Sequence, residues 1–244
     1  MKTSRKKVIA FTMALLASWV LTTAQAQTSV TPTETSIGSQ KANITTQEAR
    51  QLAEEAYIFA YSMLENYKTM YARAVNEQLP TFGAPFNQFS HRRELLDPTF
   101  TEVVAPNNDT LYSMAWLDLG TEPVVLSLPA FPDERYYVIQ IVDMYAFNME
   151  YIGARATGYE PGRYLFAGLD WDGPIPDGID GVRRTEGRYL FLLSRIAANG
   201  VEDVPAVKAL QDQYRLTPLS AYLGQPSPEP APTEAAENVA EQEV

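Results

Sequence analysis

The sequence predicts a mainly β domain, in which an N-terminal amphipathic helix or helix pair is followed by an antiparallel β-sandwich and a short closing helix. Apolar residues recur in steps of three and four between Ala49 and Val75, which is the period of an amphipathic helix. From about residue 102 the period falls to two or to short apolar runs, which Gly, Pro, Asn and Asp separate. Many short strands joined by such turn residues favour a sandwich or a barrel.

Residues 1–26 are predicted to be a cleavable secretory signal peptide. Basic residues at positions 2, 5, 6 and 7 precede an apolar run from Val8 to Leu21, which is shorter than the roughly 20 residues that cross a bilayer. Ala24-Gln25-Ala26 then forms a small-x-small cleavage site, so that Gln27 is the first mature residue. We therefore expect a periplasmic or secreted protein, with an uncleaved membrane anchor as the alternative.

Composition excludes several kinds of site and partner. The chain has no cysteine, which excludes thiolate zinc sites, cysteine nucleophiles and a disulfide framework. Its net charge is −11, and without residues 1–26 it has 15 basic residues against 30 acidic ones, a charge of −15. Such a surface repels phosphate backbones and anionic lipids. We therefore expect neither nucleic acid nor, after signal cleavage, a membrane as partner.

The mature chain divides into a leader, one domain and a tail. Residues 27–43 are rich in Thr, Ser and Gln and are expected to be a flexible leader. Residues 44–224 form the domain, whose helix begins at the capping-box pair Thr45 and Glu48. Residues 225–244 contain four prolines, five glutamates and no basic residue, which predicts a disordered Pro/Glu-rich tail.

The strands of the domain are expected to be short. The predicted ranges are 102–105, 111–119, 123–128, 135–142, 146–152, 163–167, 181–185 and 188–196. Asp203 and Pro205 then have the spacing of a helix cap and a first turn, which predicts a closing helix to about Tyr214.

Five segments of the chain resemble the DUF1254 domain family, in the order that the family has them. They are EAYIFAYSMLENYKTMY (Glu55 to Tyr71), FNQFSHRRELLDP (Phe86 to Pro98), VVAPNNDTLYSMAWLDL (Val103 to Leu119), PDERYYVIQIVDMYAFNMEYIGARATG (Pro132 to Gly158) and LQDQYRLTPLSAY (Leu210 to Tyr222). The resemblance implies an immunoglobulin-like β-sandwich, usually followed by a second β-rich domain of the DUF1214 family. That domain is missing here, which fits either a natural single-domain member or a truncated chain. The family has no assigned function, so the resemblance implies no catalytic residue.

His91 is the natural candidate for a general base, because it is the single histidine of the chain. A Ser-His-Asp arrangement around it would need Ser90, Ser113 or another serine to fold against the ring. The alternative is a polar residue that anchors a loop onto the sheet, with Arg92 and Arg93 paired to acidic neighbours. The sequence favours this second interpretation.

Asn107, Asn108 and Asp109 stand directly before the expected strand 111–119. Their oxygens could ligate a hard cation such as calcium or hydrogen-bond a sugar. Asn and Asp also form turns that bond their own backbone, and the spacing is not that of an EF-hand loop. The pattern therefore favours a turn, and no cofactor is predicted beyond this candidate calcium site.

Two further sets of residues are candidates for a ligand site. Tyr112 and Trp116 alternate with Met114 and could form a stacking platform, although period two favours a place in the sandwich core. Asp143 ends an apolar strand and Arg155 lies in a loop, so the two could bind a polar ligand together. The structural alternative is that they pair with each other or cap loops.

Two functions from different classes fit these observations. The first is an exported binding or accessory domain for a small polar or carbohydrate-like ligand or for a protein partner. The second is a hydrolase-like enzyme that uses His91 with Asp109 or Asp143, with or without a metal ion. The single histidine and the absence of a nucleophile motif favour the first.

Overall fold

The computed structural model describes residues 44–101 and 103–230 of the chain. The predicted signal peptide and leader (1–43), and most of the predicted tail (231–244), lie outside these described residues. None of the helices in the described ranges is long and apolar enough to cross a membrane.

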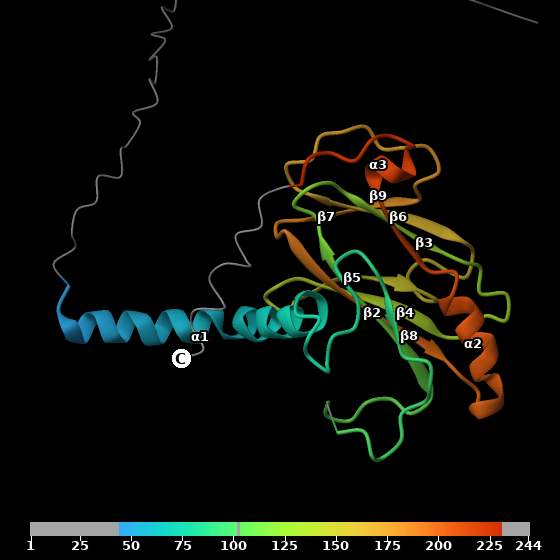
Figure 1. Ribbon diagram of the computed structural model, residues 1–244, viewed down its shortest axis with the longest axis horizontal. Helices are drawn as coiled ribbons and strands as arrows, with labels where there is room; N and C mark the ends of the chain where they lie inside the picture. Colours follow the sequence, from blue (N-terminus) through green and yellow to red (C-terminus); the bar gives the residue numbers. More distant parts are fainter. Residues whose placement is uncertain (1–43, 102, 231–244) are drawn as a thin grey trace, which may run out of the picture. The chain divides into compact units, whose positions relative to one another are not determined.

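Two β-sheets form the centre of the described chain (Figure 1). The first has five strands in the order β1-β2-β8-β4-β5, and the second has four strands in the order β7-β6-β3-β9. The strands are Ser90–His91 (β1), Thr110–Asp118 (β2), Val124–Leu128 (β3), Tyr137–Val142 (β4), Asn148–Gly153 (β5), Gly162–Gly168 (β6), Gly181–Thr185 (β7), Tyr189–Ala197 (β8) and Arg215–Pro218 (β9). The predicted sandwich-like pair of sheets is confirmed, whereas the immunoglobulin-like connectivity stays a prediction.

The main core lies between the two sheets. Along β8, buried residues alternate with half-buried ones, so that Leu190, Leu192 and Ile196 point to the same side. They join Leu126 and Phe166 of the four-stranded sheet in one apolar cluster. Burial of each such side chain stabilises the fold by about 1.5–3 kcal/mol.

Three parts of the strand prediction are wrong. β7 runs parallel to β6, so the four-stranded sheet is mixed rather than antiparallel; residues 169–180 supply the crossover that a parallel pair needs. Residues 103–105 form no strand, because this segment lies on the surface, where Val104 is 97% exposed. β1 and β9 were missed, since two and four residues are too few to show a period.

The N-terminal helix α1 (Thr46–Met70) begins at the predicted capping box: the Glu48 N–H donates to Thr45 Oγ1, and the Thr45 N–H donates to Glu48 Oε2. The helix continues as a π-helical turn, η1 (Tyr71–Val75). Met70 is the one buried residue of α1, and Figure 1 shows the start of α1 clear of both sheets. Its exposed large apolar side chains are Leu52, Tyr57, Ile58, Phe59, Tyr61 and Leu64.

A second, smaller apolar cluster lies on the outer face of the five-stranded sheet. There α1 and η1 pack on Trp116 of β2, whose ring stacks on Phe191 with 4.8 Å between ring centroids. Because side chains alternate along a strand, Tyr112 and Met114 share this outer face with Trp116. The predicted place of this set in the sandwich core is therefore wrong. The intervening residues of β2, such as Leu111, fill the inner face instead.

Helix α2 (Val204–Gln211) follows a single 3-10 turn, η2 (Val201–Asp203), and is tied to the five-stranded sheet. Arg135 donates to both carboxylate oxygens of Asp203 at 3.0 and 3.2 Å, and to the Ala197 carbonyl at 3.2 Å. Asp203 makes no cap hydrogen bond of its own, contrary to the prediction, because Arg135 and the Asn199 N–H engage its carboxylate. The helix ends at Gln211, three residues before the predicted end.

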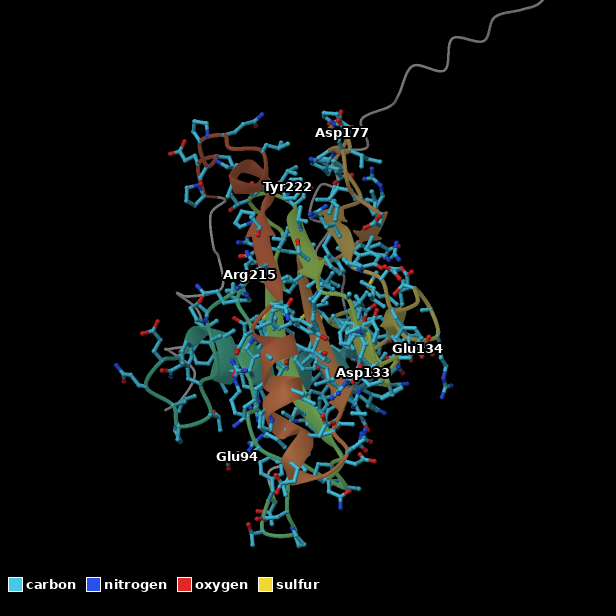
Figure 2. All side chains as sticks on the ribbon, turned by 90° about the vertical axis from the view of Figure 1, so that its right-hand side faces the viewer. Glu94, Asp133, Glu134, Asp177, Arg215 and Tyr222 are labelled. Carbon is cyan, nitrogen blue, oxygen red and sulfur yellow. The ribbon has the colours of Figure 1, made fainter. Side chains whose placement is uncertain are left out.

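A short helix, α3 (Leu219–Tyr222), follows β9. Glu122 accepts hydrogen bonds from the Ser220 N–H at 2.6 Å and from the Ser220 hydroxyl at 2.9 Å. The Tyr222 hydroxyl donates to the Asp177 carbonyl at 3.3 Å, and Figure 2 shows these two segments at the same end of the molecule. These three bonds attach the end of the domain to the four-stranded sheet.

Candidate functional site

An open cleft of about 380 Å³ lies beside His91. Four segments form it: the end of the N-terminal helix, the loop that follows, β1 with the residues after it, and β2 at Met114. We call it the His91 cleft and define it by Arg73, Pro80, Thr81, Phe82, Gly83, Ser90, His91, Arg92, Arg93, Glu94 and Met114.

The π-helical turn η1 positions one wall of the His91 cleft. The Arg73 carbonyl in this turn accepts the Gly83 N–H at 2.9 Å and the Ala84 N–H at 3.4 Å, which holds the loop against the helix end. Gly83 also allows a close approach to β1, since a Cβ atom there would lie 3.0 Å from Ser90 Oγ. π-Helical turns are rare in proteins, and those that occur are often located at functional sites.

Strand β1 directs two neighbouring side chains to opposite faces of the sheet. It pairs with β2 so that Ser90 is opposite Met114 and His91 is opposite Ser113. Ser90 and Met114 therefore lie on the outer face, near η1, whereas His91 and Ser113 face the side of the core. The His91 ring also stacks on Phe89, with 5.6 Å between centroids.

His91 belongs to a partly buried polar network. Its Nδ1 lies 2.7 Å from the Ser113 hydroxyl, which also accepts the Gln211 side-chain N–H at 3.0 Å. The same amide donates to the carbonyls of Tyr112 and Arg92, at 3.0 and 3.3 Å. The Ser113 hydroxyl is 0% exposed and has His91 Nδ1 as its one acceptor among the described residues, so we assign its proton to that bond. The ring is therefore neutral and carries its proton on Nε2.

The electrostatics of the site agree with a neutral ring. Burial, together with the positive charges of Arg93 and Arg215, lowers the pKa of His91 to about 4, while Asp212 acts in the opposite direction. His91 is therefore uncharged at neutral pH. Its Nε2–H group is a hydrogen-bond donor, and no described residue accepts a hydrogen bond from it.

Stability should fall as the pH is lowered from 7 to 5. The pKa of His91 is about 6.5 in the unfolded chain and about 4 in the folded chain. As the pH falls from 7 to 5, the unfolded state therefore binds a proton that the folded state does not, which favours unfolding. We expect a loss of about 1–2 kcal/mol after allowing for the solvent screening of a half-buried ring. Urea unfolding at pH 7, 6 and 5 measures it. In His91→Gln most of the slope between pH 7 and 5 should be lost, since His91 is the chain's single histidine and only carboxyl groups with lowered pKa values, such as Asp133 and Asp203, still contribute near pH 5. A slope as steep as that of the parent would contradict the assignment.

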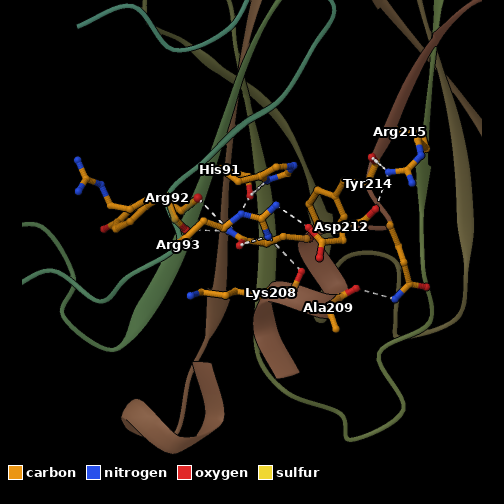
Figure 3. Close-up of polar contacts among 12 residues, drawn as sticks. His91, Arg92, Arg93, Lys208, Ala209, Asp212, Tyr214 and Arg215 are labelled. Atoms are coloured by element: carbon orange, nitrogen blue, oxygen red, sulfur yellow. Dashed lines mark hydrogen bonds and ion pairs between the residues drawn. The ribbon is translucent and has the colours of Figure 1, made fainter. Parts of the chain in front are cut away.

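The two arginines after His91 have different neighbours. Arg93 reaches α2, where Nη2 lies 2.5 Å from Asp212 Oδ1 and Nη1 donates to the Lys208 carbonyl at 3.2 Å; Figure 3 shows the two side chains turned toward each other. Arg92 lies with its guanidinium 4.4 Å from the centre of the Phe100 ring. Among the described residues, no carboxylate pairs with Arg92. Arg92 is therefore able to meet an anion, whereas Arg93 holds the loop on α2.

The Asn/Asp cluster predicted as a candidate cation or sugar site lies on the surface before β2. The Asp109 carbonyl accepts the Ala198 N–H at 2.8 Å, and the Asn107 N–H donates to the Tyr112 hydroxyl at 2.9 Å. Asn108 is exposed beside them. In the part of the chain that the structure describes, no three His, Asp or Glu side chains come together to hold a metal ion.

The other predicted site residues lie away from His91. Asp143 Oδ1 accepts the N–H groups of Tyr145 and Phe147, both at 2.9 Å, and so shapes the turn between β4 and β5. Arg155 is exposed in a different cleft of about 340 Å³, which it lines with Tyr136, Tyr137 and Tyr151. The structure therefore does not bring Asp109, Asp143 and His91 into one site.

Three residues of the candidate site were missed by sequence reasoning: Arg73, Gln211 and Asp212. Gln211 offered one signal, because it stands four residues after the apolar Val207 and so shares the buried face of α2. A glutamine at a buried helical position indicates a polar network. Arg73 and Asp212 offered none, since each looks like an ordinary charged residue on a helix surface.

A family model described as a protein of unknown function, DUF1254, matches residues 86–218, more than half of the chain. The chain belongs to the DUF1254 family. The matched region contains His91, Ser113 and Gln211 but begins after Arg73.

Solved structures give two further comparisons. The VPA0106 protein from Vibrio parahaemolyticus is 35% identical, with a TM-score of 0.63 over 75% of this chain and 42% of its own, so the chain spans less than half of that protein's length. An uncharacterized protein from Burkholderia cenocepacia is 14% identical, with a TM-score of 0.37 over 56% of this chain and 36% of its own, which is too low to bear on the fold. No curated protein matches the chain.

Proposed function

We propose that this DUF1254 protein is an exported binding domain that holds a small anionic ligand in the His91 cleft. The observation that carries the proposal is the set of hydrogen-bond donors in the cleft. Arg92 has no carboxylate partner among the described residues, and the neutral His91 ring offers Nε2–H beside it. A guanidinium and an N–H donor favour oxyanions, with which they make charge-assisted hydrogen bonds.

The charge of the His91 cleft supports an anion over a sugar or a cation. Three arginines and one glutamate line it, on a chain whose net charge is −11. A positive cleft on an acidic surface concentrates small anions while the rest of the surface repels large polyanions. Among the polar, carbohydrate-like and protein ligands that the sequence allowed, a small anion therefore fits the lining best.

The geometry favours binding over the alternative, hydrolysis at His91. Ser113 is the serine that meets the ring, but this residue is 0% exposed, so a substrate carbonyl has no path to its oxygen. Asp109 stands just before β2, four residues from Ser113 and so about 13 Å away at the rise of a β-strand. The carboxylate that acts on His91 is Asp212, which Arg93 engages.

Anion binding can be tested by isothermal titration calorimetry at pH 7 on the chain from Gln27, with sodium succinate, sodium phosphate and glucose. We expect one equivalent of an anion to bind and glucose not to bind. Arg92→Gln should weaken binding by roughly tenfold or more, because it removes a charge-assisted hydrogen bond. The matched control is Arg155→Gln in the other cleft, which should bind as the parent does. Absence of binding by both anions, or equal affinities for Arg92→Gln and the parent, would refute the proposal.

Export is the second part of the proposal. It is supported by the basic residues, the apolar run and the cleavage site within residues 1–26. N-terminal sequencing of the protein recovered from the periplasm or the medium tests it, because cleavage at the predicted bond leaves Gln27 first. Recovery from the cytoplasm with residues 1–26 in place would contradict it.

A further inference from the structure

A small recess of about 20 Å³ adjoins the His91 cleft. The two spaces share the lining residues Arg73, Gly83, Ser90 and Met114, so the recess lies directly beside the cleft. A space of this size holds a single water-sized atom or group.

Trp116 also lines the recess, and its indole N–H is buried with no hydrogen-bond partner among the described residues. The residue is 4% exposed, and its ring is fixed by stacking on Phe191. Buried polar groups in proteins are almost always hydrogen-bonded, because a buried donor without an acceptor loses its bonds to water and gains nothing. This N–H is therefore a buried donor without an acceptor beside the candidate ligand site.

Two more hydrogen-bonding side chains line the same recess. The Ser90 hydroxyl and the Gln88 amide make no side-chain hydrogen bond to any described residue. Ser90 is held there by β1, opposite Met114, and Gly83 closes in on it from the loop after η1. Three unused polar groups thus meet around a space that admits one atom.

We infer that the recess takes one oxygen of a ligand carboxylate, which accepts the Trp116 N–H and the Ser90 hydroxyl. The inference rests on the proposed function and names its ligand class. A planar carboxylate can place one oxygen edge-on in the recess and turn the rest of the ligand toward Arg92 and His91. A phosphate is less suited, because four oxygens surround its tetrahedral centre, whereas the recess admits a single atom.

The test removes the Trp116 N–H and keeps the ring. Trp116→Phe is the simple variant; replacement of Trp116 by 3-benzothienylalanine, in which sulfur stands for the N–H, preserves the shape if the Phe variant is unstable. Calorimetry with sodium succinate and sodium acetate should show roughly tenfold weaker binding by either Trp116 variant than by the parent, as expected for one lost hydrogen bond to a charged acceptor. Trp171→Phe, at the other tryptophan of the domain, is the control and should bind as the parent does.

The outcomes separate this inference from the proposed function. If succinate binds, Arg92→Gln weakens it and the benzothienyl protein binds as tightly as the parent, the cleft binds anions but the recess takes no ligand oxygen. If phosphate binds more tightly than succinate, the carboxylate class is wrong. If no anion binds the parent, the proposed function falls, and this inference with it.

In Trp171→Phe, whose fluorescence reports Trp116 alone within residues 27–244, the emission should change on titration with succinate and stay constant with glucose.

Discussion

Gly153→Ala is expected to lower the free energy of unfolding by about 3 kcal/mol or more, because the added methyl group meets the backbone of the neighbouring strand. A Cβ atom at Gly153 would collide with the Tyr137 carbonyl oxygen and lie 2.8 Å from the Val138 Cα. Both are backbone atoms of β4, and Val138 is the direct partner of Gly153 in the β4–β5 pair. Relief of the collision would therefore require the two strands to separate at this point. Urea unfolding at pH 7 measures the loss.

Gly158→Ala is the matched control for this prediction. Gly158 has a left-handed backbone, with φ +81°, but nothing lies within 4 Å of the position that a Cβ atom would take. The cost is then the conformational one alone, about 1 kcal/mol. An equal loss at both positions would contradict the collision, because it would show that the backbone angle controls the stability at Gly153 as well.

Sequence reasoning succeeded for the long strands of the five-stranded sheet. The ranges 111–119 and 188–196 were predicted for β2 and β8, which the structure has at Thr110–Asp118 and Tyr189–Ala197. One face of each strand is buried between the sheets, so apolar residues recur at every second position. Nine residues contain several repeats of this pattern, which makes the strand recognisable. The direction of β7 could not be predicted in the same way, since the pattern along a strand does not say which neighbour it pairs with.

The candidate site was predicted only in part, for a related reason. His91 was singled out by its chemistry, since it is the one side chain with an ordinary pKa near neutrality. Its partners were not, because Ser113 is 22 residues away along the chain and Gln211 a further 98. The pairing of β1 with β2 brings Ser113 to His91, and the position of α2 brings Gln211 to both. Neither contact has a local pattern in the sequence.

The outer face of β2 shows how one pattern can serve two surfaces. Tyr112, Met114 and Trp116 have the alternation of a sandwich-core strand, yet they face outward, where α1 and η1 pack on Trp116. The residues between them are buried on the inner face, so that both faces of the strand are covered at Trp116. Where both faces are covered, the alternation no longer distinguishes the inner face, and the recess beside Trp116 lies on the side that the sequence assigned to the core.

Gln211→Leu is expected to lower the free energy of unfolding by about 2–4 kcal/mol. Leucine fills a similar volume, so the loss reports hydrogen bonds rather than packing. Gln211 is 0% exposed, and its amide donates to the carbonyls of Arg92 and Tyr112 and to Ser113 Oγ, all of which leucine leaves without this donor. Gln213→Leu is the control, because Gln213 bonds the Ala209 carbonyl at the exposed surface and should change stability by about 0.5 kcal/mol or less.

A second measurement tells a specific network from general loosening of the core. In the parent, the Ser113 oxygen accepts from Gln211 and donates its proton to His91 Nδ1, an arrangement that favours the neutral ring. Without Gln211, the hydroxyl is free to turn and accept an N–H from a protonated ring, so the pKa of His91 should rise from about 4 toward its ordinary value. NMR titration of the single histidine in folded Gln211→Leu measures this. An unchanged pKa together with an unchanged unfolding midpoint would show that α2 holds to the sheet without the network, and that the neutral ring of His91 depends on burial and on the nearby arginines alone.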